Sequence, residues 1–329
     1  MKVRFATFNT FNLVKEGVPY YGRQNYNHTD YQKKIHWCAG QLQAMDADFV
    51  GFQEVFHREA LEDVVRLSGL YPQGIIEVAG ETGDLPRVAF VSRLPVMKTQ
   101  IIDSFPPEAR IDAEGILLPY DRFHRPILKV WVNLPSGQTA IIFVVHLKSK
   151  RPLMTEGSPR HDPWEDTKGL VRSLTLRACE AAALRYLILK EISHTKTPLI
   201  VLGDLNDAAH AVTSDILQGK LPQKNYPLEV KFKLWDILLY SCSDLQVRKS
   251  YKDVYYTHLH NSHYESLDHI FVSQEFVNEN PRCIGNVEYM KLFTDHLMDT
   301  ALTDDPPPSH TSDHGQVVIS IRLKSPGEN

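Results

Sequence analysis

Two polar residues follow a strand-like apolar run near the middle of the chain. In VLGDLND, Asp204 and Asn206 are separated by Leu205, so in an extended backbone their side chains share one face and Leu205 points to the other. One interpretation is an Asx turn that closes the strand. The other is one wall of a catalytic site, because loops after the carboxyl ends of strands carry much α/β chemistry. This motif alone does not separate the two.

Apolar runs end in polar residues at five further places. These residues are Asn9 in FATFNTF, Glu54 in VGFQEV, His146 in FVVHLKS, Asp268 in SLDHIF, and Asp313 with His314 in TSDHGQVV. Each alone has a structural explanation, such as a turn cap, a helix start or a hydrogen-bonded core histidine. Burying a polar group without a hydrogen-bond partner costs roughly 2–7 kcal/mol. This many isolated polar residues at the ends of buried strands are therefore difficult to explain separately. One shared site explains them together.

Six segments occur in an order that resembles the motifs of the endonuclease/exonuclease/phosphatase superfamily: FNTFN, FQEV, HLKS, GDLND, LDHIFVS and SDHGQV. That superfamily holds deoxyribonuclease I, abasic-site endonucleases, neutral sphingomyelinases and inositol polyphosphate phosphatases. The resemblance runs from about Val3 to about Leu323. HLKS is more similar to deoxyribonuclease I and the phospholipase-like members than to the abasic-site enzymes, which lack that histidine. The resemblance implies a four-layer α/β sandwich, two packed mixed β-sheets flanked by helices, as a single domain over residues 1–329.

The resemblance also implies a metal-dependent phosphoesterase. In-line attack of water on a phosphodiester needs a base for the water, positive charge near the phosphoryl oxygens and an acid for the leaving group. Glu54 is predicted to bind Mg²⁺ or Mn²⁺, because these ions prefer hard oxygen donors. Asn9 and Asp313 are predicted to complete or orient that metal shell.

The remaining motif residues receive catalytic roles from the resemblance. Asp268 is predicted to hold the imidazole of His314 in the tautomer and orientation of a base. Asp204 and Asn206 are predicted to position the water and donate to the phosphoryl oxygen. His146 is predicted to protonate the leaving oxygen or to stabilise the charged intermediate. Either Asp204 or His314 is the base. A second carboxylate, expected to orient His146, lies among Glu77, Glu81 and Asp84.

Basic residues close to these motifs are candidates for phosphate contacts. Arg125 in FHRPILKV and Lys148 in HLKSKRP are predicted to bind substrate. A surface ion pair for Arg125 and a solvated basic face around Lys148 are the alternatives. Trp164 is a candidate for stacking on a base. The HxH pattern in THLHNSH faces one way on a strand, but no fourth zinc ligand is evident, so structural zinc is not predicted there.

Composition narrows the classes of partner. With 36 basic and 40 acidic residues, the formal net charge is −4, which argues against a strong nonspecific attraction to nucleic acid or anionic membrane and leaves room for a local basic patch. No apolar stretch has the length of a membrane span. The N-terminus enters a strand-like pattern at once, so no signal peptide is predicted. We expect a cytoplasmic monomer whose four scattered cysteines are free thiols.

The periodicity of apolar residues predicts the elements that position these motifs. Strands are expected near 3–9, 48–55, 87–96, 125–134, 139–149, 198–207, 254–260, 266–273 and 315–323, and helices near 30–47, 58–69 and 172–193. The stretches 104–126, 149–169 and 303–312 are expected to be long loops, which in compact domains are often functional.

A divalent-metal phosphodiesterase acting on DNA is the first hypothesis for the function. A phosphoesterase on a small or lipid substrate, sphingomyelinase-like or inositol-phosphatase-like, is the second. No hydrophobic hairpin and no dense Lys/Arg group is evident in the sequence, which favours nucleic acid. A catalytically inactive binding module is the least favoured, because every motif residue is present.

Overall fold

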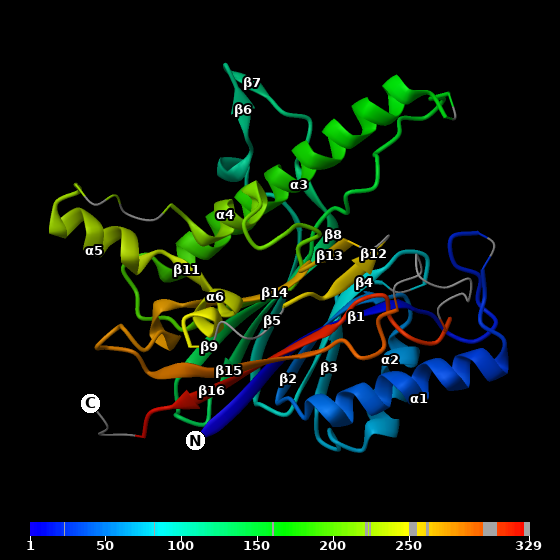
Figure 1. Cartoon of the computed structure of the whole chain (residues 1–329), viewed down its shortest axis with the longest axis horizontal. Coiled ribbons are helices and arrows are strands. Elements are labelled where there is room, and N and C mark those ends of the chain that lie inside the picture. Colours follow the sequence, from blue (N-terminus) through cyan, green and yellow to red (C-terminus); the bar gives the residue numbers. More distant parts are fainter. Residues whose placement is uncertain are drawn as a thin grey trace.

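A computed structural model describes residues 1–22, 24–81, 83–159, 161–220, 223, 225–249, 255–260, 263–298 and 308–325. Two six-stranded mixed sheets pack face to face, with helices on both outer sides (Figure 1). This is the predicted four-layer sandwich. None of the helices in the described residues is long and apolar enough to cross a membrane.

The first sheet has the strand order β15-β16-β1-β2-β4-β3. Its strands are β1 (Lys2–Leu13), β2 (Phe49–Val55), β3 (Ile75–Val78), β4 (Arg87–Ser92), β15 (Gly285–Phe293) and β16 (Gln316–Leu323). Strands β1 and β2 are parallel, and β1 and β16 are antiparallel. The start of β16 therefore lies next to the middle of β1, so the TSDHG segment comes close to the FNTFN segment.

The second sheet has the order β11-β14-β10-β9-β8-β5. Its strands are β5 (Val96–Ser104), β8 (Arg122–Asn133), β9 (Thr139–His146), β10 (Leu199–Asp204), β11 (Leu239–Ser241) and β14 (Asp268–Ser273). Strands β9 and β10 are parallel, whereas β10 and β14 are antiparallel. The HLKS, GDLND and LDHIF motifs consequently meet at one edge of this sheet.

Three apolar cores fill the spaces between the layers. Phe5 and Phe49 of the first sheet pack with Val130 and Ile142 of the second, which forms the central core. Helices α1 (His28–Met45) and α2 (Arg58–Ser68) cover the outer face of the first sheet. Helix α3 (Pro163–Ile192) covers the outer face of the second. The four cysteines are buried and free, as expected.

Helix α3 begins nine residues before the predicted start. The Oδ1 atom of Asp162 accepts hydrogen bonds from the backbone N–H groups of Trp164 and Glu165, at 2.8 and 3.1 Å, and Pro163 occupies the first helical position. This is a complete N-terminal cap. The early part of the helix has few buried residues, and therefore lacks the apolar periodicity on which the prediction relied.

The predicted loop over 104–126 contains a small hairpin. Strands β6 (Asp112–Ala113) and β7 (Ile116–Leu117) are joined by Glu114 and Gly115, which both have positive φ, 53° and 81°. This backbone matches the tight turns that suit a two-stranded ribbon. Strands of two residues are too short to produce an alternating pattern. The hairpin projects from the sandwich on the same side as α3, apart from the N-terminal end of that helix (Figure 1).

Shorter elements complete the described chain. They are η1 (Pro107–Ala109), α4 (Val212–Gln218), α5 (Leu228–Asp236), α6 (Cys242–Val247), β12 (His258–His260), β13 (His263–Glu265) and η2 (Gln274–Phe276). The strand expected over 254–260 starts at His258, and its first residue lies outside the described part. Residues 303–307 of the predicted loop over 303–312 lie outside it as well.

Candidate active site

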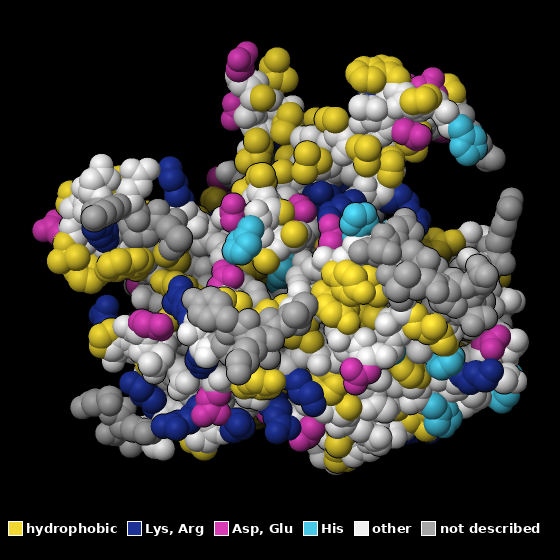
Figure 2. Space-filling model, in the orientation of Figure 1, with side chains coloured by type: hydrophobic (Ala, Val, Ile, Leu, Met, Phe, Trp, Pro, Cys, Tyr) yellow, Lys and Arg dark blue, Asp and Glu magenta, His cyan; other side chains and the backbone are white. Residues whose placement is uncertain are grey.

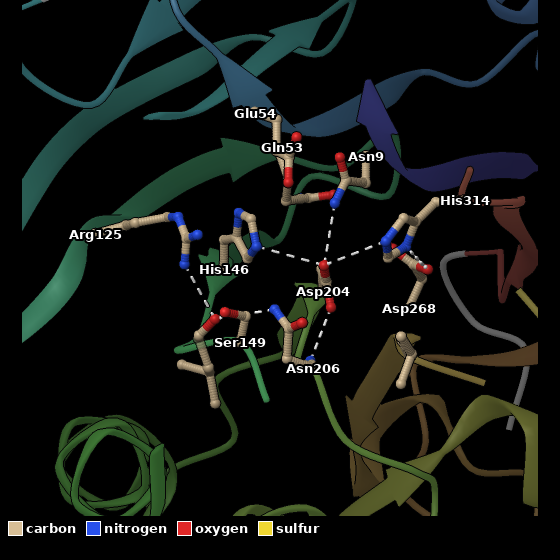
Figure 3. A network of polar contacts seen from close by, with 12 residues as sticks. Asn9, Gln53, Glu54, Arg125, His146, Ser149, Asp204, Asn206, Asp268 and His314 are labelled. Carbon is tan, nitrogen blue, oxygen red and sulfur yellow. Dashed lines mark hydrogen bonds and ion pairs between the residues drawn. The ribbon is translucent and has the colours of Figure 1, made fainter. Parts of the chain in front are cut away.

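Strand register brings the polar motif residues together. Asp204 at the end of β10 stands opposite His146 on parallel β9 and Asp268 on antiparallel β14. On the first sheet, Asn9 of β1 stands opposite Gln53 of β2. Because the two sheets pack face to face, the ends of both sets of strands converge on one site (Figure 3).

Gly203 is required for the way Asp204 is presented. It has φ of 150°, and a Cβ atom at this position would lie 2.0 Å from the backbone oxygen of Val145. No other residue fits so close to the neighbouring strand. The glycine in GDLND thus lets β10 approach β9 closely where His146 and Asp204 face each other.

The carboxylate of Asp204 is the centre of the site. Its Oδ2 atom accepts a hydrogen bond from Asn9 Nδ2 at 3.0 Å and lies 3.4 Å from His146 Nε2 and 3.9 Å from His314 Nε2. Its Oδ1 atom accepts from the backbone N–H of Asn206 at 2.7 Å. The side chain is 1% exposed, and burial raises the pKa of this carboxyl from 3.8 to about 7. The group therefore has the proton affinity of a base at neutral pH.

The pKa values of the two histidines are shifted in opposite directions. His314 Nδ1 is 2.7 Å from Asp268 Oδ2. Burial acts to lower the pKa of His314, but Asp268 and Asp204 outweigh it and hold that pKa well above 6.5. Burial and the Arg125 guanidinium hold the pKa of His146 well below 6.5. The surroundings therefore favour the protonated form of His314 and the neutral form of His146.

Asn206 forms part of the wall beside Asp204. It has a positive φ of 53°, which asparagine tolerates better than most residues. Its Nδ2 atom donates to the backbone oxygen of Leu147 at 3.0 Å. The segment after Asp204 thus forms an Asx-type turn, as the first interpretation of VLGDLND expects, and the same turn is also part of the polar site.

A comparison of the sequence with models of known protein families identifies the family of this chain. The model of the endonuclease/exonuclease/phosphatase family matches residues 6–314. The chain belongs to that family. Members of the endonuclease/exonuclease/phosphatase family are phosphoesterase hydrolases that depend on divalent metals.

Solved structures show the same fold at low sequence identity. The human Nocturnin catalytic domain with bound sulfate is 17% identical, with a TM-score of 0.56, and the match covers 98% of this chain and 95% of that one. A mannosyl-6-phosphatase from Bacteroides thetaiotaomicron is 14% identical, with a TM-score of 0.55, covering 98% and 100%. Truncated Caenorhabditis elegans TDP2 is 13% identical, with a TM-score of 0.55, covering 98% and 97%. No curated protein matches the chain in sequence.

The residues present fit the divalent metal of the endonuclease/exonuclease/phosphatase family. Glu54 is held at a positive φ of 62°, and its Oε2 atom accepts from the backbone N–H of Asn12 at 3.1 Å. Burial and the nearby Asp313 carboxylate raise the pKa of Glu54, and a cation would relieve both effects. Together with the Asn9 amide oxygen, Glu54 and Asp313 offer the hard oxygen donors that Mg²⁺ and Mn²⁺ prefer.

Arg125 and Lys148 both lie beside the site, but their cationic groups differ in availability. Arg125 Nη1 donates to the Leu147 backbone oxygen at 3.2 Å, and its buried Nε has no hydrogen-bond partner among the described residues. Lys148 is 4% exposed, and its Nζ donates to the backbone oxygens of Ser149 and Arg151. Arg125 thus keeps a donor without a partner among the described residues, whereas the Lys148 ammonium stabilises the loop in which it lies.

The expected second carboxylate is not found at its predicted positions. In the described part of the chain, no hydrogen bond or ion pair links His146 to Glu77, Glu81 or Asp84, and His146 Nδ1 is buried without a partner. The carboxylate that faces His146 is Asp204.

Glu180 is a buried carboxylate that the sequence analysis missed. Its Oε1 atom accepts from the backbone N–H of His124 at 2.6 Å, and its Oε2 atom accepts from that of Lys148 at 2.7 Å. Burial raises its pKa to about 7. It ties α3 both to the strand that carries Arg125 and to the loop after His146. The available signal was a lone acid in the apolar run ACEAAAL.

Replacing Glu180 with glutamine is expected to lower the free energy of unfolding by about 1–3 kcal/mol. Only one oxygen would remain, and the new amide N–H₂ would face a backbone N–H that it cannot accept from. Urea unfolding at pH 8 measures the loss. Exposed Glu156 is the control, because Glu156→Gln should change stability by less than about 0.5 kcal/mol. Equal stability of the two variants would contradict the bridging role of Glu180.

Proposed function

We propose that this protein is a divalent-metal-dependent phosphodiesterase that hydrolyses its substrate by in-line attack of water, with DNA as the favoured substrate. The observation that carries the proposal is the buried Asp204 carboxylate, which lies within 4 Å of two histidines whose pKa values are shifted in opposite directions. We also propose that the enzyme acts as a monomer in the cytoplasm, which light scattering and cell fractionation would test.

The charge states suggest how protons move. Asp204 takes a proton from the attacking water, because its raised pKa makes it a base near neutral pH. The water oxygen bonds to phosphorus as the bond to the leaving oxygen breaks, and His314 gives its Nε2 proton to that oxygen. The proton on Asp204 then returns to His314 across 3.9 Å. This assignment makes Asp204 the base and gives Asp268 the role of orienting His314.

The other site residues bind the substrate or stabilise the charge that develops on it. His146 is neutral, so of its two predicted roles we propose stabilisation of the charged intermediate. The Asn206 side chain positions the water and contacts the phosphoryl oxygen, and the Arg125 guanidinium binds a nonbridging oxygen. A divalent ion held by Glu54, Asn9 and Asp313 supplies positive charge to the developing phosphoryl anion when it is bound.

Basic side chains next to the site support a nucleic-acid substrate. Lys150 and Arg151 follow Lys148 in the loop after β9 and are exposed, and Lys and Arg side chains gather beneath the projecting end of α3 (Figure 2). Such a patch can bind successive phosphates although the whole chain is acidic. Lys150 also pairs with Glu265 at 3.0 Å, so substrate would have to compete with this ion pair.

Exposed apolar side chains beside the site favour a second candidate, a lipid phosphoester. Ile116 and Leu117 of the β6–β7 hairpin are 73% and 54% exposed, although no apolar hairpin was evident in the sequence. The N-terminal half of α3 exposes Trp164, Leu170, Val171 and Leu174. The Tyr120 hydroxyl donates to the Arg172 oxygen at 3.4 Å and joins the two projections. The Arg151 oxygen accepts from Ser173 Oγ, which joins α3 to the site loop.

Metal removal and a substrate panel test the proposal together. We expect hydrolysis of bis(p-nitrophenyl) phosphate and plasmid DNA with Mg²⁺ or Mn²⁺, and loss of nearly all turnover in EDTA that excess Mg²⁺ restores. Single-stranded DNA and sphingomyelin vesicles complete the panel. Turnover of vesicles without turnover of DNA would select the lipid substrate. Metal binding without turnover of any phosphoester would contradict the proposal and leave the inactive binding module.

A further inference from the structure

His258 lies beside the catalytic His314 without having any part in the proposed hydrolysis. The two residues form an isolated antiparallel bridge, and the backbone N–H of Gly315 donates to the Thr257 oxygen at 2.6 Å. Their ring centroids are 5.1 Å apart. Backbone hydrogen bonding therefore holds the two imidazoles close to each other, so their proximity does not depend on a flexible side chain.

Three side chains in this place offer metal-binding atoms close to one another. One ligand atom each from His258, Asp313 and His314 lies within 4.8 Å of the other two. His258 Nδ1 is buried without a hydrogen-bond partner in the described part of the chain. The Asp313 carboxylate is exposed and likewise has no hydrogen bond or ion pair to a described residue. Two of the three residues, His258 and Asp313, thus keep a ligand atom that no described residue occupies.

Asp268 prepares His314 for a metal as well as for catalysis. It holds Nδ1 of His314 at 2.7 Å, which leaves Nε2 directed into the site. A carboxylate behind a histidine in this way fixes the tautomer and raises the basicity of a metal-binding imidazole. Two imidazoles and one carboxylate suit Zn²⁺ far better than Mg²⁺, which prefers oxygen donors.

We propose that His258, Asp313 and His314 form an inhibitory Zn²⁺ site at the edge of the active centre. Zn²⁺ bound there occupies the Nε2 atom that His314 needs for proton transfer, and it takes Asp313 from the Mg²⁺ shell. His314 and Asp313 thus take part either in hydrolysis or in zinc binding. His258 supplies the third ligand, which favours zinc binding. The inhibitory part rests on the proposed function, whereas the zinc site itself does not.

Metal binding tests the site without any assay of activity. Metal-stripped protein is titrated with Zn²⁺ by calorimetry, and with Co²⁺ while the visible spectrum is recorded, for wild type, His258→Ala and His260→Ala. His260 is the matched control, because it lies on the same strand but outside the cluster. We expect one site in wild type and in His260→Ala. Affinity in His258→Ala should fall at least about tenfold, since even residues behind a metal ligand contribute that much.

Equal affinity in wild type and His258→Ala, or the same loss in His260→Ala, would overturn the zinc site. Thermal melts verify that the variants fold, and His258→Asn replaces the alanine variant if that one does not.

A second assay tests inhibition. Turnover at saturating Mg²⁺ is followed against Zn²⁺ concentration, with each variant normalised to its own rate without zinc. The half-inhibitory concentration should rise at least about tenfold in His258→Ala, and an unchanged value overturns the inhibitory role. If wild type hydrolyses no phosphoester at all, the proposed function fails, and the binding titration still decides the zinc site.

Discussion

Replacing His314 with alanine is expected to lower kcat for bis(p-nitrophenyl) phosphate by about 10²- to 10⁴-fold, the range for loss of a positioned proton donor. His314 is 9% exposed at its side chain and contacts Asp268 at 2.7 Å. In the proposed mechanism, its imidazolium supplies both a proton and positive charge to the leaving oxygen. Water cannot replace both, so saturating Mg²⁺ should not restore the rate.

Two further variants, Asp268→Asn and His210→Ala, are needed to interpret the kcat of His314→Ala. Asp268→Asn keeps the shape of the side chain but removes the charge that holds the His314 proton, so its kcat should fall between those of wild type and His314→Ala. His210→Ala is the neutral control, because the His210 side chain is 78% exposed. A kcat for His314→Ala within tenfold of wild type would remove His314 from the catalytic step.

The candidate site residues were predictable because they interrupt an otherwise regular pattern of apolar residues. Asp204, His146 and Asp268 each end or begin a strand of apolar residues, and β-sheet geometry brings such ends together. The arrangement of two packed sheets was expected from the family resemblance, whereas the apolar periodicity predicted the individual strands. Register, which sets Asp204 directly opposite both partners, could not be obtained from one sequence.

Other features depend on contacts between distant segments. Glu180 is bound to residues 56 and 32 positions away, and nothing in its local sequence identifies those partners. The proximity of His258 to His314 comes from a bridge between segments over 50 residues apart in sequence. The β6–β7 hairpin rests on positive φ at Glu114, an unusual residue for that backbone. Local sequence patterns predict helices, strands and the polar residues at strand ends. Contacts between residues far apart in the sequence depend on the completed fold.

Asparagine in place of Asp204 is expected to lower kcat by about 10²- to 10⁴-fold, as for loss of a general base, and to change how stability depends on pH. The amide retains the size of the carboxyl group and its acceptor for the Asn206 N–H, but it cannot take a proton from water. The loss of activity should therefore occur without unfolding. Steady-state kinetics and a urea melt of the same preparation measure both effects.

The pH dependence follows from the raised pKa of Asp204. Between about pH 4 and pH 7 the unfolded chain releases this proton while the folded protein keeps it, so wild type loses stability relative to Asp204→Asn as pH rises. A shift from 3.8 to about 7 corresponds to a relative loss on the order of 4 kcal/mol. His314 acts in the same direction, because its folded-state pKa is also raised and its contribution is lost at higher pH. Urea melts of both proteins in EDTA, from pH 4 to pH 8, measure this difference. A difference that does not vary with pH would show that Asp204 binds no proton in this range, and the role of base would then pass to His314.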